Sequence, residues 1–114
     1  MHIQDPWFTE ILMGRKTVEG RVGSIPSKYA VYVGGQMKIE CDNLSTIVKV
    51  NMIIHYQNLE SYLRNEWRRA APHVGSLEEA RSAYMAILDE GFPVFSDERV
   101  KKNGGINAIY IELI

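Results

Sequence analysis

The most informative stretch of this sequence is residues 14–21, which read Gly-Arg-Lys-Thr-Val-Glu-Gly-Arg. Three ionisable side chains, Lys16, Glu19 and Arg21, stand close together there, directly after an apolar segment. In an extended chain alternate side chains share a face, so Thr17, Glu19 and Arg21 lie together and Glu19 can pair with Arg21. Lys16 falls on the opposite face unless the first residues of the stretch are still turning. A solvated strand of alternating charge is one interpretation, and a functional cluster of charged side chains is the other.

A short helix is expected before this stretch. Asp5 is a suitable N-cap, and Pro6 suits the first helical position because its missing N–H has no partner there in any case. The following apolar residues recur at helical spacing, and they are Trp7, Phe8, Ile11 and Leu12. Gly14 then stands where a helix ends in a left-handed residue, so we expect a positive φ at Gly14.

The segment from Arg15 to Val22 is predicted to be extended. Further strands, separated by turns, are expected between it and Tyr56. A turn is expected over residues 23–27, followed by an apolar stretch from Tyr29 to Val33 and a tight turn at Gly34-Gly35. Residues 37–41 alternate between apolar and charged, which predicts a strand with one wet face. A turn at residues 43–45 should lead into the clearest strand, whose buried face is formed by Val48, Val50, Met52, Ile54 and Tyr56.

Helices and a last strand complete the chain. Asn58 can cap a helix with an apolar side, formed by Leu59, Tyr62, Leu63 and Trp67. Ser76 and Glu79 have capping-box spacing before a stripe that runs to Leu88 and is ended by Gly91 and Pro93. A helical turn over 97–102 and a strand with Ile109, Ile111 and Leu113 on one face follow. These elements predict an α+β fold: a small, closed or nearly closed barrel with a short helix after the first strand and a helical insertion before the last one.

Length and composition limit the classes of function. The chain has 114 residues, 46% of them hydrophobic, which predicts one domain over residues 1–114. A formal net charge of −1 excludes a polybasic protein that binds nucleic acid through bulk charge. One cysteine and three histidines without ligand spacing predict neither a metal site nor a cofactor. No apolar run is long enough to span a membrane, and no secretory signal opens the chain, so we expect an intracellular, cytoplasmic protein.

The sequence resembles the ASCH domain family. The hallmark of that family is GxKxxExR after a short helix, and residues 5–21 match it. The resemblance continues through Gly34-Gly35, residues 50–56, residues 72–84 and residues 105–109, so it spans nearly the whole chain. It implies a small PUA-like barrel beside which the Lys, Glu and Arg of the hallmark line a cleft.

The resemblance implies that this cleft binds RNA or a nucleotide. Some bacterial ASCH proteins hydrolyse N4-acetylcytidine or are reported to cut RNA, which makes Lys16 and Glu19 the candidates for catalysis. The amidohydrolases have Thr where this chain has Glu19, and a Glu where it has Ala71-Pro72-His73. Binding of RNA or a nucleotide is therefore the first prediction. A hydrolase acting on RNA or on a modified nucleoside is the alternative, and a protein-interaction module of the coactivator type is the second alternative.

The predicted ligand-binding residues are those of the hallmark and its surroundings, and they are Trp7, Lys16, Thr17, Glu19, Arg21 and Tyr56. Trp7 can stack on a base or belong to the core, whereas Tyr84 is expected to be core. His73 could act as an acid or base or be solvated. A cleft lysine would be dispensable for folding, so Lys16→Ala should affect binding and not stability.

A basic cluster outside the hallmark is a weaker candidate. Arg64 and Arg68 share a helical face that could contact phosphates. Glu60 lies four residues before Arg64, so an ordinary surface ion pair is the alternative.

Overall fold

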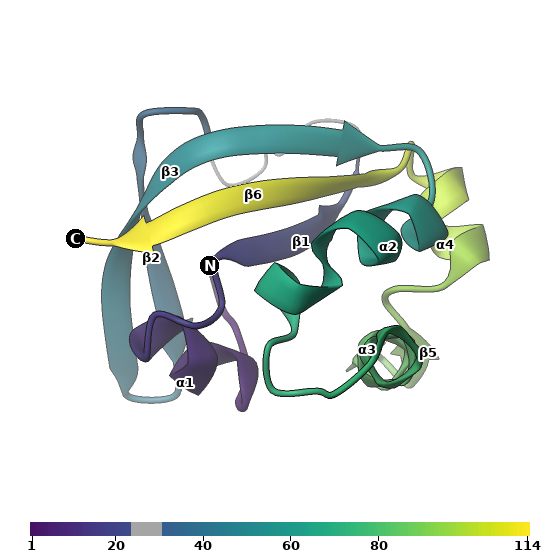
Figure 1. Ribbon diagram of the computed structural model, residues 1–114, viewed down its shortest axis with the longest axis horizontal. Coiled ribbons are helices and arrows are strands. Elements are labelled where there is room, and N and C mark those ends of the chain that lie inside the picture. Colours follow the sequence, from purple (N-terminus) through teal and green to yellow (C-terminus); the bar gives the residue numbers. More distant parts are fainter. Residues whose placement is uncertain (24–30) are drawn as a thin grey trace.

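A curled, four-stranded antiparallel sheet forms the centre of the computed structural model, which describes residues 1–23 and 31–114 (Figure 1). Its strand order is β1-β6-β3-β2. These strands are β1 (Val18–Val22), β2 (Gln36–Cys41), β3 (Leu44–Tyr56) and β6 (Ile106–Leu113). The helices are α1 (Trp7–Leu12), α2 (Leu59–Ala70), α3 (Leu77–Met85) and α4 (Asp97–Lys102). A small hairpin, β4 (Leu88–Asp89) and β5 (Phe92–Pro93), lies between α3 and α4.

The N-terminal segment lies between the two edge strands of the sheet, β1 and β2, and is hydrogen-bonded to both. Ile3 N–H donates to the Glu40 carbonyl at 2.8 Å on β2, while the Arg21 guanidinium on β1 donates to the His2 carbonyl at 3.1 Å. The α+β class and the barrel-like sheet are therefore confirmed, with the sheet as a half-barrel. The short helix was expected after the first strand, but α1 precedes β1. The residues before α1 form only an isolated bridge, between His2 and Glu40.

The residues at the two ends of α1 determine how the chain enters residues 14–21, the hallmark stretch. Pro6, and not Asp5, is the N-cap, and the Asp5 carboxylate instead accepts from the N–H and hydroxyl of Thr9, at 3.0 and 2.7 Å. Gly14 has φ of 75°, as predicted, which turns the chain out of the helix. The Glu10 carbonyl accepts from the N–H groups of Arg15 and Lys16, both at 3.0 Å, and β1 begins two residues later.

A bulge in β3 corrects the predicted burial of that strand. Val48 and Val50 are buried as expected, but the pairing with β6 shifts between Val50 and Met52, which leaves Asn51 without a pairing partner. One extra residue disturbs the alternation, so Met52 is 43% exposed, whereas Ile54 and Tyr56 are half-buried against the core. The hairpin turn before β3 also lies one residue earlier than expected, at Asp42-Asn43, because Cys41 pairs with Leu44.

The predicted helix over residues 77–88 ends early. Asn58 and Ser76 cap α2 and α3 as expected, accepting from Ser61 N–H and Glu79 N–H at 2.8 and 3.1 Å. After Met85, however, the chain enters the β4–β5 hairpin. Glu90 and Gly91 both have positive φ, the conformation that a two-residue hairpin turn requires. The apolar residues after α3 therefore form a small hairpin wall and not a last helical turn.

The last strand is more deeply buried than alternation predicts. Ile106, Asn107, Ala108 and Ile109 are all buried, since β6 pairs with β1 on one side and with β3 on the other and is covered on both faces. Leu113, expected on the buried face, is 41% exposed.

The remaining loop predictions are partly outside the structure. The turn at Gly34-Gly35 is confirmed by a bond from Gly35 N–H to the Tyr32 carbonyl at 3.0 Å. The expected turn over 23–27, beyond Gly23, and the apolar stretch at Tyr29 lie outside the described residues. No helix in the described ranges is long and apolar enough to cross a membrane.

Candidate functional site

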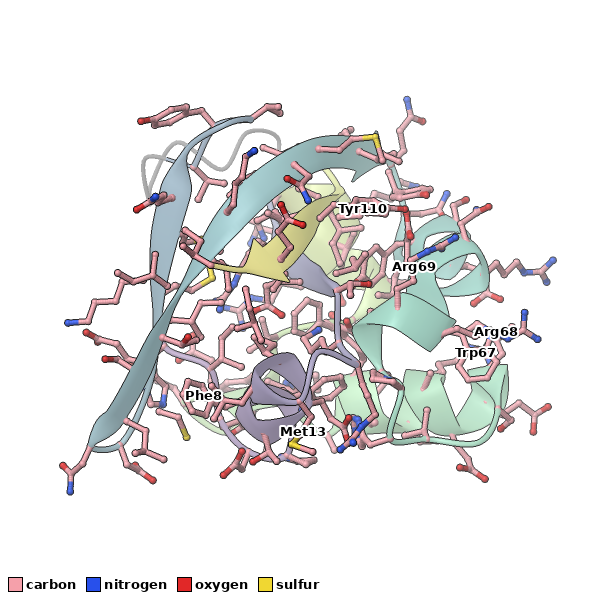
Figure 2. The ribbon with its side chains drawn as sticks, turned by 60° about the vertical axis from the view of Figure 1, so that its left-hand side comes forward. Phe8, Met13, Trp67, Arg68, Arg69 and Tyr110 are labelled. Atoms are coloured by element: carbon pink, nitrogen blue, oxygen red, sulfur yellow. The ribbon has the colours of Figure 1, made fainter. Side chains whose placement is uncertain are left out.

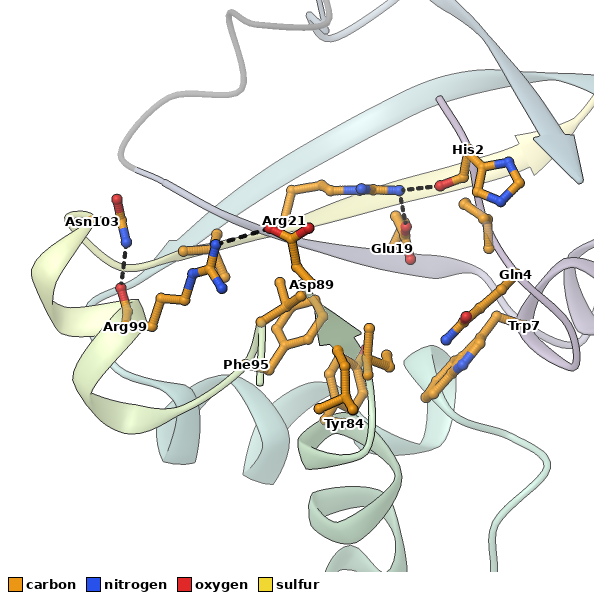
Figure 3. A pocket seen from close by; sticks show the side chains of 15 residues that line it. His2, Gln4, Trp7, Glu19, Arg21, Tyr84, Asp89, Phe95, Arg99 and Asn103 are labelled. Carbon is orange, nitrogen blue, oxygen red and sulfur yellow. Dashed lines mark hydrogen bonds and ion pairs between the residues drawn. The ribbon is translucent and has the colours of Figure 1, made fainter. Parts of the chain in front are cut away.

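A pocket of about 630 Å³ lies between β1, the N-terminal segment, the end of α3, the β4–β5 hairpin and α4 (Figure 3). One side is aromatic and aliphatic, and another carries the charged side chains of β1. The apolar lining residues are Ile3, Trp7, Val22, Tyr84, Ile87, Leu88, Val94 and Phe95. The polar ones are His2, Gln4, Glu19, Arg21, Asp89, Arg99 and Asn103.

Glu19 is the charged group at the centre of the hallmark. Its side chain lines the pocket although the residue is only 8% exposed. One carboxylate oxygen lies 2.8 Å from Nη2 of Arg21, and the other lies 3.3 Å from Nζ of Lys16. The predicted Glu19–Arg21 pair is therefore confirmed. Each oxygen of the Glu19 carboxylate therefore contacts one cation, and the group presents acceptor oxygens to the pocket.

Lys16 lies behind the pocket and not in it. The residue is 2% exposed, and Nζ donates to the carbonyls of Val18 and Ala70 at 2.5 and 2.7 Å in addition to its contact with Glu19. These three acceptors match the three protons of an ammonium group. Burial lowers the pKa of Lys16, while Glu19 opposes that shift. Because Lys16 joins β1 to the end of α2, the expectation that it is dispensable for folding does not fit the structure.

An aromatic cluster forms the adjoining part of the pocket. The Trp7 ring packs edge-on against Tyr84 and His73, with centroids at 5.1 and 4.7 Å, and Lys16 Nζ lies 5.2 Å from the Trp7 centroid. Tyr84 is buried, as predicted, yet it also lines the pocket, and its hydroxyl bonds to that of Tyr62 at 2.6 Å. Trp7 and Tyr84 thus serve the core and the pocket wall together.

His73 is a packing residue. It does not line the pocket, and its Nδ1 is buried without a hydrogen-bond partner in the described part of the chain. Burial lowers the pKa of His73 despite the nearby Glu10 carboxylate. The ring therefore packs against Trp7 at the edge of the core.

The rim of the pocket contains residues that sequence reasoning missed. Nη2 of Arg99 on α4 lies 3.2 Å from Oδ2 of Asp89 on the hairpin, and Asn103 donates to the Arg99 carbonyl at 2.8 Å. The sequence does not indicate them, because the apolar stripe predicts a helix as far as Leu88, ended by Gly91 and Pro93, in place of the hairpin. In the structure, the Asp89–Arg99 ion pair connects the β4–β5 hairpin to α4.

Other predicted ligand residues lie away from this pocket. Thr17 lies beside a second, smaller cavity and extends the β1–β6 pairing through its carbonyl, which accepts from Ile111 N–H at 2.9 Å. The Tyr56 hydroxyl donates to Glu66 at 2.8 Å beneath α2, so Tyr56 is not on the pocket rim. Burial and Glu66 raise the pKa of Tyr56. Tyr110 also donates to Glu66, at 2.5 Å, and burial helps raise its pKa to about 12.

The basic cluster on α2 is on the outer surface. Arg64 pairs with Glu60 at 3.0 Å, the alternative that the spacing allowed. Arg68 is exposed and lies over the half-buried Trp67 ring at 5.2 Å (Figure 2). Within residues 1–23 and 31–114, no group of three or more His, Cys, Asp or Glu side chains could hold a metal ion.

Comparison with known proteins agrees with this geometry. The ASCH domain matches residues 1–114, the whole chain. This chain belongs to the ASCH domain family. The predicted family and its PUA-like fold are thereby confirmed, and the hallmark residues Glu19 and Arg21 occupy one side of the pocket.

Solved structures similar to this chain cover all or nearly all of it. The hypothetical protein PH0355 is 30% identical, with a TM-score of 0.74 over 100% of this chain and 96% of that chain. Protein PF0455 from Pyrococcus furiosus is 27% identical, with a TM-score of 0.66 over 100% and 94%. ZmASCH from Zymomonas mobilis, at 16% identity, shares the fold with a TM-score of 0.62 over 98% of this chain and 65% of that one. The comparison with curated proteins gave no match.

Proposed function

We propose that this ASCH domain binds a nucleotide, free or as a single-stranded unit of RNA, in the pocket beside β1. The observation that carries the proposal is a cavity of about 630 Å³ in which an aromatic wall adjoins the Glu19–Arg21 pair. That volume is in the ordinary range for small-molecule sites. Unpaired bases are read in the same way, by aromatic contact together with hydrogen bonds to their polar edges.

The charges of the pocket favour recognition through the base. Glu19 and Asp89 balance Arg21 and Arg99, so the lining itself is neutral, and the whole chain has a net charge of −1. Binding through many phosphates would need an excess of cations. We therefore expect selective, modest affinity with weak salt dependence.

The two tryptophans provide a matched test of the site. Trp7→Leu should weaken binding of a ribonucleoside 5′-monophosphate about tenfold, which corresponds to about 1.4 kcal/mol and lies in the range for one aromatic–base contact. Trp67 does not line the pocket, so Trp67→Leu should leave the affinity unchanged. Isothermal titration of both folded variants measures this. Equal affinity of Trp7→Leu and the parent, or an equal loss in Trp67→Leu, contradicts the proposed site.

Hydrolysis is tested with the same protein. All three donors of Lys16 are engaged within the fold, and Glu19 stands where the amidohydrolases have Thr. We therefore expect N4-acetylcytidine to be released unchanged after binding. Cytidine formation well above background would replace the binding proposal with the hydrolase alternative, in which Glu19 and Lys16 would be the first residues to test.

A further inference from the structure

We infer that the pocket selects a base that presents two adjacent N–H donors, which among the common bases is guanine. The inference rests on the proposed function, because it names the base that the nucleotide site prefers. It follows from the position and the contacts of one side chain, Glu19.

Glu19 is the carboxylate of the pocket interior. The other carboxylate of the lining, Asp89, is on the exposed hairpin and its side chain is 60% exposed, whereas that of Glu19 is 11% exposed. Lys16 and Arg21 contact different oxygens of Glu19 and hold its carboxylate in place at the pocket wall. An ionised carboxylate has no proton to donate and about four lone-pair sites, so both oxygens retain acceptor capacity.

An acceptor-only group with two oxygens discriminates among bases. The N1–H and the N2 amino group of guanine lie side by side and can each donate to one oxygen, which gives two charge-assisted bonds. Adenine and cytosine place a ring-nitrogen acceptor beside their amino group, and uracil places carbonyls on both sides of its N–H. Each of these bases would bring an acceptor lone pair against the negative carboxylate, which is unfavourable in a site shielded from water.

The hydrophobic surroundings strengthen this preference. Trp7, Tyr84 and Phe95 line the same pocket as Glu19 and are all buried (Figure 3). A base seated against them would meet Glu19 away from bulk water, where an unmatched polar contact is costly. A flat ring with a donor edge therefore fits both sides of the cavity.

The experiment compares 5′-monophosphates of guanosine, inosine, adenosine, cytidine and uridine by isothermal titration with the full chain. They carry the same phosphate, so differences in affinity report the base. We expect guanosine monophosphate to bind about tenfold more tightly than inosine monophosphate, which lacks the N2 amino group, and more tightly still than the other three. Tighter binding of any other base, or equal binding of the guanosine and inosine nucleotides, contradicts the inference alone. Absence of binding by all five contradicts the proposed function and the inference with it.

Charge variants identify the group responsible. Glu19→Gln replaces one acceptor oxygen with a donor and should abolish the preference for guanosine over inosine monophosphate. Glu112→Gln, an exposed residue outside this pocket, removes the same charge and should retain the preference. A preference that persists in folded Glu19→Gln contradicts the assignment to Glu19. If Glu19→Gln does not fold, the relative affinities of the parent protein for the five nucleotides still test the preference for guanine.

Discussion

Lys16→Met is expected to lower the free energy of unfolding by about 3 kcal/mol, as breaking one side of a buried ionic cluster generally does. Methionine fills a similar volume, so the loss reports the missing ammonium and not a cavity. Without it the carbonyls of Val18 and Ala70 lose their Nζ donor, and Glu19 keeps only Arg21. Urea denaturation measures the change.

Lys38→Met is the matched control for this prediction. The Lys38 side chain is 62% exposed and pairs with Glu40 on the surface of β2, where an ion pair contributes little. We expect a change below about 0.5 kcal/mol in that variant. Equal stability of Lys16→Met and Lys38→Met would show that Lys16 is not a structural link between β1 and α2.

Gly20→Ala should be similarly damaging, at about 3 kcal/mol, because the position has no room for a methyl group. A Cβ on Gly20 would overlap the Tyr62 hydroxyl and come within 2.7 Å of Cζ in the same ring. Tyr62 cannot move aside easily, since it is fully buried and its hydroxyl bonds to that of Tyr84 at 2.6 Å. The substitution therefore separates β1 from α2 and disturbs the pocket wall at Tyr84.

Gly75→Ala separates this steric effect from the general cost of replacing glycine. Gly75 lies in the loop before α3, and the nearest atom to a Cβ there is Oε2 of Glu79, at 3.4 Å. We expect thermal denaturation to show little change for Gly75→Ala and a large fall in melting temperature for Gly20→Ala. A Gly20→Ala protein as stable as the Gly75→Ala protein would mean that α2 and β1 are not in close contact.

The parts of the fold that depend on local chemistry were predictable. Asn58, Ser76 and Gly14 act through bonds or dihedral angles within a few residues, and their effects are confirmed. The alternation in β2 was equally clear, because Met37, Ile39 and Cys41 are buried. The Glu19–Arg21 pair followed from strand geometry alone.

The parts of the fold that depend on tertiary packing could not be predicted from the sequence. Nothing in the residues around Asn51 distinguishes a bulge from regular alternation, so the exposure of Met52 was not predicted. Glu66 is charged and stands in a helix, yet it is buried because Tyr56 and Tyr110 donate to it from the sheet. Burial of charged side chains is rare without such partners, and partners from distant strands are invisible in one sequence.

The position of Lys16 shows the same limit at the site itself. The position of Lys16 in the hallmark predicted a side chain in the cleft. The structure instead buries its ammonium group, which donates to the carbonyl of Ala70, 54 residues further along the chain. The pocket rim at Asp89 and Arg99 also needed the β4–β5 hairpin, which is too short to show a pattern.

The most direct test of nucleotide binding in the pocket uses the indole N–H resonances of the two tryptophans. Trp7 lines the pocket, and Trp67 on α2 is half-buried outside it. Titration of the labelled protein with each of the four ribonucleoside 5′-monophosphates should shift the Trp7 signal saturably with at least one of them, while the Trp67 signal stays in place. A Trp7 signal unmoved by all four, or a saturable shift of Trp67 in its stead, would contradict the account.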